Sequence, residues 1–181
     1  MSDDGVPFGL VPSDPDLRLR PTNAGDEPFT RQLFREVRGE QFIAAGLSGP
    51  ILEQIIEQQF RSQTAGYAAQ FPGAISFIVT RNDAAIGRLL LDCASERWHI
   101  IDVALLPAAC GRGIGTRIIE ALEAGAGQRG VGALTLMVLA TNGAARRFYL
   151  RQGFAEVGQA GASHIAMRKT SPSPQLPRAG T

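Results

Sequence analysis

A glycine-rich turn near the middle of the sequence has the composition of a phosphate-binding loop. An apolar run at residues 100–106, rich in branched side chains, predicts a buried strand that ends at Pro107. Gly111, Gly113 and Gly115 follow, and glycine lets the backbone approach a ligand without a Cβ in the way. Apolar residues then recur at helical spacing. Because a helix N-terminus offers unpaired N–H groups and partial positive charge, the segment predicts a pyrophosphate-binding site.

Two other nucleotide-binding loops fit this turn less well. The dinucleotide pattern G-x-G-x-x-G needs a third glycine where Thr116 stands, and it needs an acidic residue about 20 positions further on. Residues 131–136 contain no carboxylate. A nucleoside-triphosphate loop needs a lysine, and the only lysine in the chain is the distant Lys169. A dinucleotide site therefore remains a weak alternative, and the triphosphate loop fails.

A second motif follows after a predicted helix and a predicted strand. Residues 142–154 read N-G-A-A-R-R-F-Y-L-R-Q-G-F. They resemble the motif N-x-x-A-x-x-F-Y-x-x-x-G-F of the GNAT N-acetyltransferase superfamily at every fixed position. Residues 107–116 likewise resemble the family's acetyl-coenzyme A signature, Q/R-x-x-G-x-G/A. Because two motifs occur in the right order, the resemblance is more specific than a glycine turn alone; it covers roughly residues 17–169.

This resemblance implies a binding site for acetyl-CoA as the acyl donor. The pantetheine arm would pair with the backbone of residues 103–105. The residues implied to contact the donor are Val103, Ala104, Leu105, Cys110, Gly111, Arg112, Gly113, Ile114, Gly115, Thr116, Asn142 and Ala145. Cys110 departs from the family, which usually has Arg or Gln there, and Arg112 or Arg117 could supply the missing charge. Asn142 is equally suited to cap the helix that follows it.

Acyl transfer from a thioester to an amine needs a polarised carbonyl, a neutral amine and a proton for the leaving thiolate. The resemblance implies that the main chain near Leu105 polarises the carbonyl. It also implies that Tyr149 is the general acid, because the tyrosine of the second motif often lies near the coenzyme sulfur. A phenol with a pKa of about 10 carries its proton at pH 7.

His99 is our candidate for the general base, with Glu96, Asp102 and Asp92 as alternatives. An imidazole with a pKa of about 6.5 suits proton transfer at pH 7. Strand alternation predicts that His99 shares a face with residues 101, 103 and 105, and that Asp102 points to the opposite face. Cys93 and Cys110 have no identified histidine partner, so we expect inert thiols.

The composition indicates one globular domain and excludes several classes of protein. The chain has 181 residues, 44% of them hydrophobic, and a formal net charge of +1, which makes no case for nucleic acid or an acidic membrane surface. Two cysteines and two histidines without ligand spacing predict neither a disulfide framework nor a metal site. The start lacks the features of a signal peptide, and we expect a cytoplasmic monomer or homodimer.

Apolar periodicity and turn residues predict the elements in chain order. These are a strand at 17–20, helices around 29–37 and 48–70, strands at 75–80, 86–92 and 98–106, a helix from 114, a strand at 134–139, a helix at 142–152 and a strand at 164–168. The resemblance implies their arrangement, an α/β fold with a mixed, strongly twisted sheet and helices on both faces. We expect a flexible arm at 1–15 with little to bury, an acetyltransferase domain at 16–169 and a disordered tail at 170–181.

The residues and the resemblance together predict an N-acetyltransferase. An acetyl group, or a longer acyl group, would pass from acetyl-CoA to a primary amine of a small molecule or protein by direct attack. A non-catalytic acyl-CoA-binding or regulatory module is the alternative. The acceptor pocket would involve the first two helices, where the polar and aromatic candidates are Arg35, Arg38, Glu40, Gln41 and Tyr67. No motif identifies the acceptor.

Overall fold

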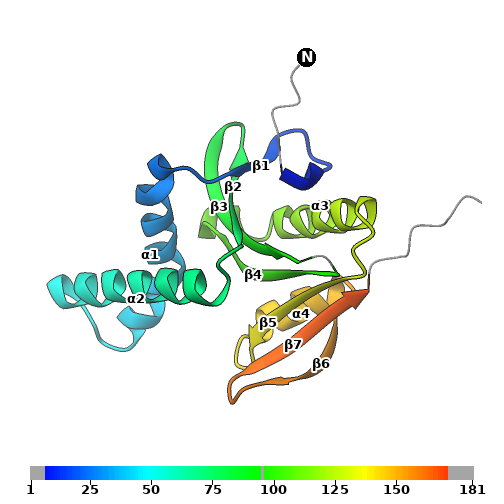
Figure 1. The fold of residues 1–181 in the computed structure, drawn as a ribbon. Coiled ribbons are helices and arrows are strands. Elements are labelled where there is room, and N and C mark those ends of the chain that lie inside the picture. The colour runs from blue at the N-terminus through cyan, green and yellow to red at the C-terminus, as the bar shows by residue number, and fades with distance from the viewer. Residues whose placement is uncertain (1–6, 95, 171–181) are drawn as a thin grey trace, which may run out of the picture.

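A seven-stranded mixed sheet organises the computed structural model, which describes residues 7–94 and 96–170 (Figure 1). The strand order is β1-β2-β3-β4-β5-β7-β6; β4 and β5 are parallel, and the other neighbours are antiparallel. The elements are η1 (Pro7–Gly9), β1 (Leu17–Pro21), η2 (Ala24–Asp26), α1 (Glu27–Ala44), α2 (Gly49–Gln70), β2 (Ile75–Arg81), β3 (Ala84–Cys93), β4 (Arg97–Leu105), η3 (Pro107–Ala109), α3 (Ile114–Gln128), β5 (Ala133–Leu139), α4 (Gly143–Arg151), β6 (Ala155–Ala160) and β7 (His164–Thr170).

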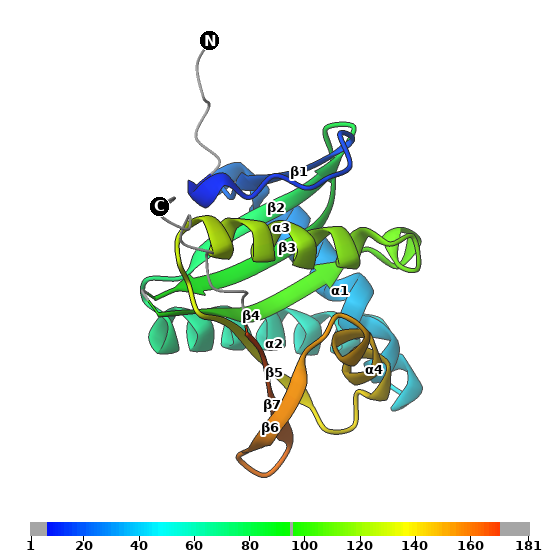
Figure 2. The same ribbon diagram turned by 90° about the vertical axis from the view of Figure 1, so that its right-hand side faces the viewer.

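The helices cover both faces of the sheet. Figure 2 shows α3 across one face of the half formed by β1 to β4, with α1 and α2 behind the other face. In Figure 1, β5, β7 and β6 run at a steep angle to that half, so the sheet opens between β4 and β5. The mixed, twisted sheet with helices on both faces confirms the fold class that the sequence predicts.

The start of α1 is tied to β1 by a partly buried ion pair. Both Asp26 oxygens accept from the Arg20 guanidinium, at 2.8 and 2.6 Å, and Asp26 also accepts from the backbone N–H of Asn23 at 2.8 Å. The Asn23 side chain accepts from Gly25 N–H, which completes a capping box. These contacts fix where the α1–α2 hairpin leaves the sheet.

The core lies mainly between α3 and the sheet, and the N-terminal segment contributes to it. Trp98, Ile118 and Leu122 are fully or almost fully buried there. Leu10 is also fully buried, and the Phe8 ring packs edge-on against Trp98 with centroids 5.6 Å apart. The expected flexible arm with little to bury is therefore wrong for this part of the segment, because two large apolar side chains pack under α3. Residues 1–6 lie outside the described residues.

One strand, β6, has no counterpart among the predicted elements. Its sequence, A-E-V-G-Q-A, contains a single branched residue, and every position but the last is exposed. An edge strand of this kind has no buried face, so it lacks the alternation by which strands are recognised. The predicted tail overlaps β7 at Thr170, and residues 171–181 lie outside the described part of the chain.

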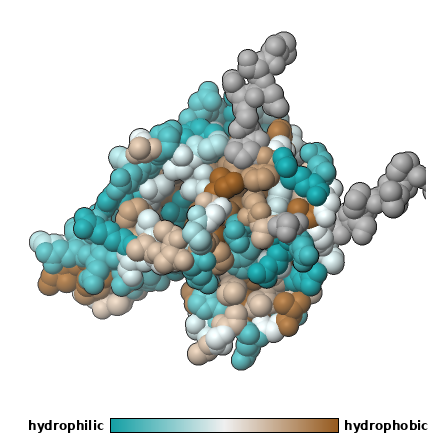
Figure 3. All heavy atoms as spheres, viewed as in Figure 1, coloured by the Kyte–Doolittle hydropathy of each residue, from teal (hydrophilic) through white to brown (hydrophobic). Residues whose placement is uncertain are grey.

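The surface is mixed in character. Figure 3 shows a largely hydrophilic outer side of the α1–α2 hairpin, with apolar colour toward its far end. Ile43 and Ile51 are the exposed apolar residues near the turn of this hairpin. None of the helices within residues 7–94 and 96–170 is both long and apolar enough to cross a membrane.

Candidate functional site

The loop between β4 and α3 presents unpaired backbone N–H groups to an open space. Gly111 and Gly113 have φ angles of 73° and 75°, the left-handed region that favours glycine. A Cβ at either position would meet nothing within 4 Å. Within the described residues, no acceptor binds the backbone N–H groups of residues 111–116, and the first helical bond runs from Arg117 N–H to the Gly113 carbonyl. The arrangement suits an anion such as a pyrophosphate.

Gly115 serves a different purpose from the other two glycines. Its φ is not positive, and a Cβ there would lie 3.1 Å from the ring of Phe148. The missing side chain lets α4 pack against the first turn of α3, where Gln152 also donates to the Thr116 hydroxyl at 3.1 Å. The sequence predicts three glycines that admit a ligand; at this one, the Cβ space is taken by α4.

The side chains beside the loop differ in the partners that they contact. The Cys110 side chain is exposed and donates weakly to the Leu106 carbonyl at 3.5 Å. Arg117 donates to the Ser13 hydroxyl at 3.1 Å and lies 3.7 Å from Asp14. Arg112 has no ion pair with any described residue. Of the two arginines suggested to replace the family's charged residue, Arg112 is thus the one not engaged by a carboxylate.

Next to this loop, β4 separates from β5 and exposes its backbone. The two strands pair only from Arg97 with Ala133 to Ile100 with Leu136. Residues 102–105 stay paired with β3 but face no strand on the β5 side, while β5 continues to Leu139 on β7. Half of the backbone N–H and C=O groups of residues 103–105 therefore point into the opening, where an extended amide chain could pair with them.

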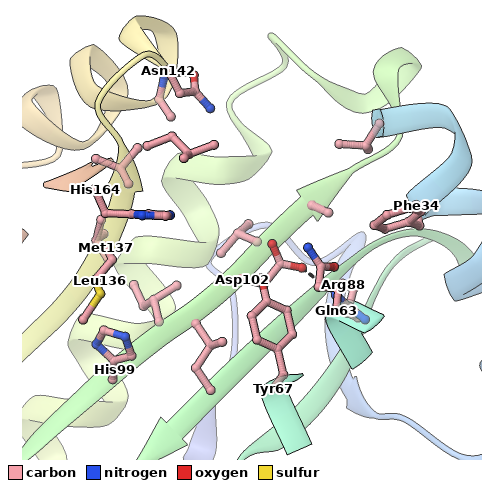
Figure 4. Close-up of a pocket in the computed structure, with 18 of the residues that line it drawn as sticks. Phe34, Gln63, Tyr67, Arg88, His99, Asp102, Leu136, Met137, Asn142 and His164 are labelled. Carbon is pink, nitrogen blue, oxygen red and sulfur yellow. Dashed lines mark hydrogen bonds and ion pairs between the residues drawn. The ribbon is translucent and has the colours of Figure 1, made fainter. Parts of the chain in front are cut away.

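A cavity of about 480 Å³ continues from this opening toward α1 and α2. Its walls come from α1, α2, β3, β4, β5, α4 and the first residue of β7, His164. In Figure 4, the Asp102 carboxylate lies beside the Tyr67 ring with a dashed line to Arg88, while His99, Met137 and His164 lie on the β5 side. Both predicted catalytic residues, Tyr149 and His99, line this same cavity.

A bulge in β4 brings His99 and Asp102 to the same face of the sheet. His99 pairs with Asp92, Ile100 with Leu91 and Asp102 with Leu90, so Ile101 has no partner of its own. The extra residue reverses the alternation from that point onward. The predicted opposition of His99 and Asp102 is therefore wrong, because strict alternation assumes a strand without a bulge. Ile100 faces the core, and His99 and Asp102 face the cavity.

Asp102 is held in an ion pair and influences two tyrosines. Its Oδ2 accepts from Arg88 Nη2 at 2.6 Å, and both side chains are mostly buried. Desolvation, and after it the Asp102 charge, raises the pKa of Tyr67, and the same two causes raise the pKa of Tyr149 to about 12. The carboxylate is thus within electrostatic reach of both hydroxyl groups. Glu96, another suggested base, lines a second cavity of about 360 Å³, which His99 also lines.

Neighbouring aromatic rings hold the Tyr149 ring in place, while its hydroxyl makes no hydrogen bond with the described residues. Its ring lies edge-on to Phe148 and Phe154, with centroid distances of 5.1 and 5.5 Å. No hydrogen bond joins its hydroxyl to any residue that the structure describes. Since burial and Asp102 hold its pKa at about 12, the phenol stays protonated across the neutral range. A proton donor therefore faces the cavity.

The His99 ring is oriented by two neighbours. Its Nδ1 lies 2.9 Å from Thr135 Oγ1, whose hydroxyl lies 3.4 Å from the Trp98 carbonyl. If the hydroxyl proton goes to that carbonyl, Thr135 accepts from Nδ1–H, and a neutral ring carries its lone pair on Nε2. The ring stacks on Phe71 at 5.5 Å. Desolvation, followed by the Arg97 charge, lowers the pKa of His99, so the neutral form predominates at pH 7.

Some candidates behave as the sequence predicts and others do not. Asn142 caps α4, accepting from Ala145 N–H at 3.1 Å, and it also lines the cavity. Arg38 and Tyr67 line the cavity, whereas Arg35, Glu40 and Gln41 do not. The sequence did not identify Arg88 as a site residue. Strand alternation places its side chain on the other face of β3 from the buried Leu89, but nothing in the sequence indicates its ion pair with Asp102. Among the described residues, no group of three or more His, Cys, Asp or Glu side chains could hold a metal ion.

Comparison with known proteins gives a family match and several similar folds. The model of the acetyltransferase (GNAT) family matches residues 38–154. A GCN5-related N-acetyltransferase from Rhodopseudomonas palustris is 28% identical, with a TM-score of 0.58 over 88% of this chain and 98% of that one. The PaiA N-acetyltransferase from Thermoplasma acidophilum, solved with coenzyme A, is 18% identical, with a TM-score of 0.63 over 85% and 98%. The ribosomal-protein-S18-alanine N-acetyltransferase from Escherichia coli is 16% identical, with a TM-score of 0.59 over 91% and 99%.

Proposed function

Because this chain belongs to the acetyltransferase (GNAT) family, we propose that it is an N-acetyltransferase that transfers the acetyl group of acetyl-CoA to a primary amine. One observation carries the proposal: an open set of backbone N–H groups at α3 adjoins a cavity that contains the protonated hydroxyl of Tyr149. An anion site next to a proton donor is what transfer from a phosphate-bearing thioester requires.

The donor is held mainly by backbone in this proposal. The N–H groups of residues 111–116 bind the pyrophosphate, and Arg112 adds a positive charge beside them. The open edge of β4 at residues 103–105 pairs with the amides of the pantetheine arm. Neither contact depends on the side chain at position 110, so donor binding tolerates Cys110 in place of the family's Arg or Gln. Asn142 lies where the arm meets α4.

Tyr149 acts as the general acid. Bound acetyl-CoA supplies the acetyl group as a thioester, whose C–S bond breaks while the C–N bond to the amine forms. Backbone N–H near Leu105 polarises the acetyl carbonyl. The Tyr149 hydroxyl donates its proton to the departing sulfur, and its packing between Phe148 and Phe154 holds it in place. No metal takes part in this proposal.

His99 acts as the general base through water. Because Ile101 is bulged out of β4, His99 and Val103 lie three strand positions apart, or about 10 Å at about 3.3 Å per residue, which is too far for direct contact with an amine at the opening. Water within the cavity would relay the proton from the amine to Nε2. The lowered pKa of His99 keeps the ring neutral and able to accept it. Asp102 is closer to the opening, but its Oδ2 is already engaged by Arg88.

Calorimetric titration of the purified chain with acetyl-CoA, CoA and NAD tests the donor half of this proposal. We expect binding of acetyl-CoA and CoA and none of NAD. Preference for NAD, or no binding of CoA, would overturn it. Release of free thiol in the presence of a panel of amines then separates an enzyme from a non-catalytic acyl-CoA-binding module. Binding of acetyl-CoA without thiol release, with the same affinity in Tyr149→Phe as in the parent, would support the non-catalytic module.

A further inference from the structure

The charges on the walls of the cavity do not balance, and the excess is positive. Among the described residues that line it, Asp102 is the only carboxylate, and the Arg88 guanidinium already pairs with it. Arg38, from α1, lines the same cavity and is only partly exposed. The Arg88 charge, and after it the Arg38 charge, act to lower the pKa of Tyr67, in opposition to burial and Asp102.

Arg38 differs from the other arginines of α1 in having no partner within the part of the chain that the structure describes. Arg31 pairs with Glu27 and Glu57, and Arg35 pairs with Glu53. Arg38 makes no ion pair or hydrogen bond with the residues that the structure describes. Arg88, by contrast, is engaged by Asp102 through Nη2, and its Nε is buried. The Arg38 guanidinium, which keeps its N–H donors unused on the wall of the cavity, is suited to bind a carboxylate.

The positions of Asp102 and Arg38 in the cavity indicate where the amine and the anionic group of an acceptor would lie. Asp102 immediately precedes Val103, at the opening where the proposed function places the acetyl group. An amine that reaches this point lies near the Asp102 carboxylate. Arg38 and Tyr67 lie on the α1–α2 side, with the apolar side chains of Leu33, Phe34 and Val37 near them. The cavity therefore joins a site for an amine, a site for an anion and an apolar wall within about 480 Å³, the size of a small-molecule site.

We propose, resting on the acetyltransferase function above, that the acceptor is a free amino acid with an apolar or aromatic side chain, whose carboxylate binds Arg38. The α-amine lies by Asp102 at the opening, and the side chain lies against the α1 wall. Arg88 holds Asp102 in place. A peptide N-terminus has no carboxylate near its amine, so it leaves Arg38 without a partner.

The test compares leucine and phenylalanine with their carboxamides as acceptors for the full chain and acetyl-CoA. Thiol release gives kcat and KM, and mass spectrometry identifies the acetylated product. We expect kcat/KM for at least one free acid to exceed that of its amide by about tenfold or more, the value of one charge-assisted hydrogen bond. In Arg38→Gln, KM for the acid should rise about tenfold with kcat little changed, while the amide should be unaffected. Arg35→Gln, on the same helix but paired outside the cavity, is the matched control.

Any other result would contradict the proposal that the acceptor is a free amino acid. Amides equal to or better than the acids, an Arg38→Gln effect of the same size on both, or acetylation of peptides but not amino acids would overturn it. If the chain binds acetyl-CoA but acetylates neither acid nor amide, the acceptor is wrong while the donor site stands. If it does not bind acetyl-CoA at all, the proposed function fails first, and the acceptor falls with it.

Discussion

The loop at the start of α3 and the cavity under α1 and α2 adjoin each other, but they are built in different ways. The loop comes from one short segment, and its useful groups are backbone N–H donors exposed by left-handed Gly111 and Gly113. The cavity comes from seven elements, and its useful groups are side chains such as Arg38, Arg88 and Asp102. A site made of local backbone can accept one constant ligand, whereas a site made of distant side chains can change with its substrate. In the proposed function, the backbone loop holds the donor and the side-chain cavity holds the acceptor.

The sharpest test of the boundary between the two regions is Tyr149→Phe. The variant keeps the ring that packs on Phe148 and Phe154 and removes only the hydroxyl. We expect kcat to fall about hundredfold or more, the usual contribution of a positioned general acid, with acetyl-CoA affinity unchanged. Steady-state kinetics and calorimetry on the same preparation measure both. An unchanged kcat would remove Tyr149 from the chemistry.

Gly113→Val tests whether the donor region depends on backbone geometry. A β-branched residue at a φ of 75° is strained by about 1–3 kcal/mol, and its side chain crowds the N–H groups. Acetyl-CoA affinity should therefore fall about tenfold to hundredfold by calorimetry. Gly127→Val is the matched control, because Gly127 lies in the same helix, has no positive φ and has nothing within 4 Å of its Cβ position. Equal losses in both variants would point to damage of α3 rather than of the loop.

The pH profile tests the role of His99 on the acceptor side. Since burial and Arg97 lower its pKa, the base form is complete at pH 7.5, and kcat/KM should decline only below about pH 6.5. Thr135→Val removes the acceptor of Nδ1–H, a bond that favours the imidazolium. The acid limb should then move to lower pH, and the rate at pH 7.5 should drop about fivefold, corresponding to one lost hydrogen bond of about 1 kcal/mol.

His99→Gln is the control for that profile, and its acid limb should disappear. A limb that persists unchanged in the variant would assign the titration to another group. Acetyl-CoA binding should be the same in the parent and in both variants, because neither side chain lies at the loop of residues 111–116.

The smallest expected effect concerns the ion pair between Arg20 and Asp26 at the start of α1, the helix that carries Arg38 to the cavity. Asp26→Asn should lower the free energy of unfolding by about 1 kcal/mol at pH 7, a value reduced because Arg20 is 41% exposed and partly screened. The Arg20 guanidinium holds the pKa of Asp26 at about 2 in the folded chain. Its stabilisation is therefore complete above the unfolded pKa of about 4 and is lost as the pH falls toward 2.

Urea unfolding at pH 7, 4 and 3 measures this contribution. The difference between the parent and Asp26→Asn should narrow as the pH falls through that window. Asp16→Asn, an exposed carboxylate in the same region without an ion pair among the described residues, should differ little from the parent at any pH. A constant difference across the three pH values would contradict the ion pair as the source.

Much of the local structure could be predicted from sequence because its signals lie within a few residues. The start of α4 at Asn142, the left-handed Gly153 after it, and the turn at Asn82 between β2 and β3 were all visible as residue types at the right places. The strand β6 was not, because an exposed edge strand has no apolar alternation. Leu10 was misjudged because a short apolar stretch between Pro7 and Pro12 does not reveal the core that it enters.

The sequence by itself determined the loop, its position between a strand and a helix, and the second motif that identifies the family. These depend on backbone conformation, which a few neighbouring residues such as Gly111 and Gly113 set. Only the tertiary structure decided which side chains meet in the cavity. The unpaired Ile101 turned Asp102 to the face of His99, and the hairpin of α1 and α2 brought Arg38 and Tyr67 to Asp102 and Arg88. Contacts between residues far apart in the chain depend on register and packing, and no short stretch of sequence encodes either.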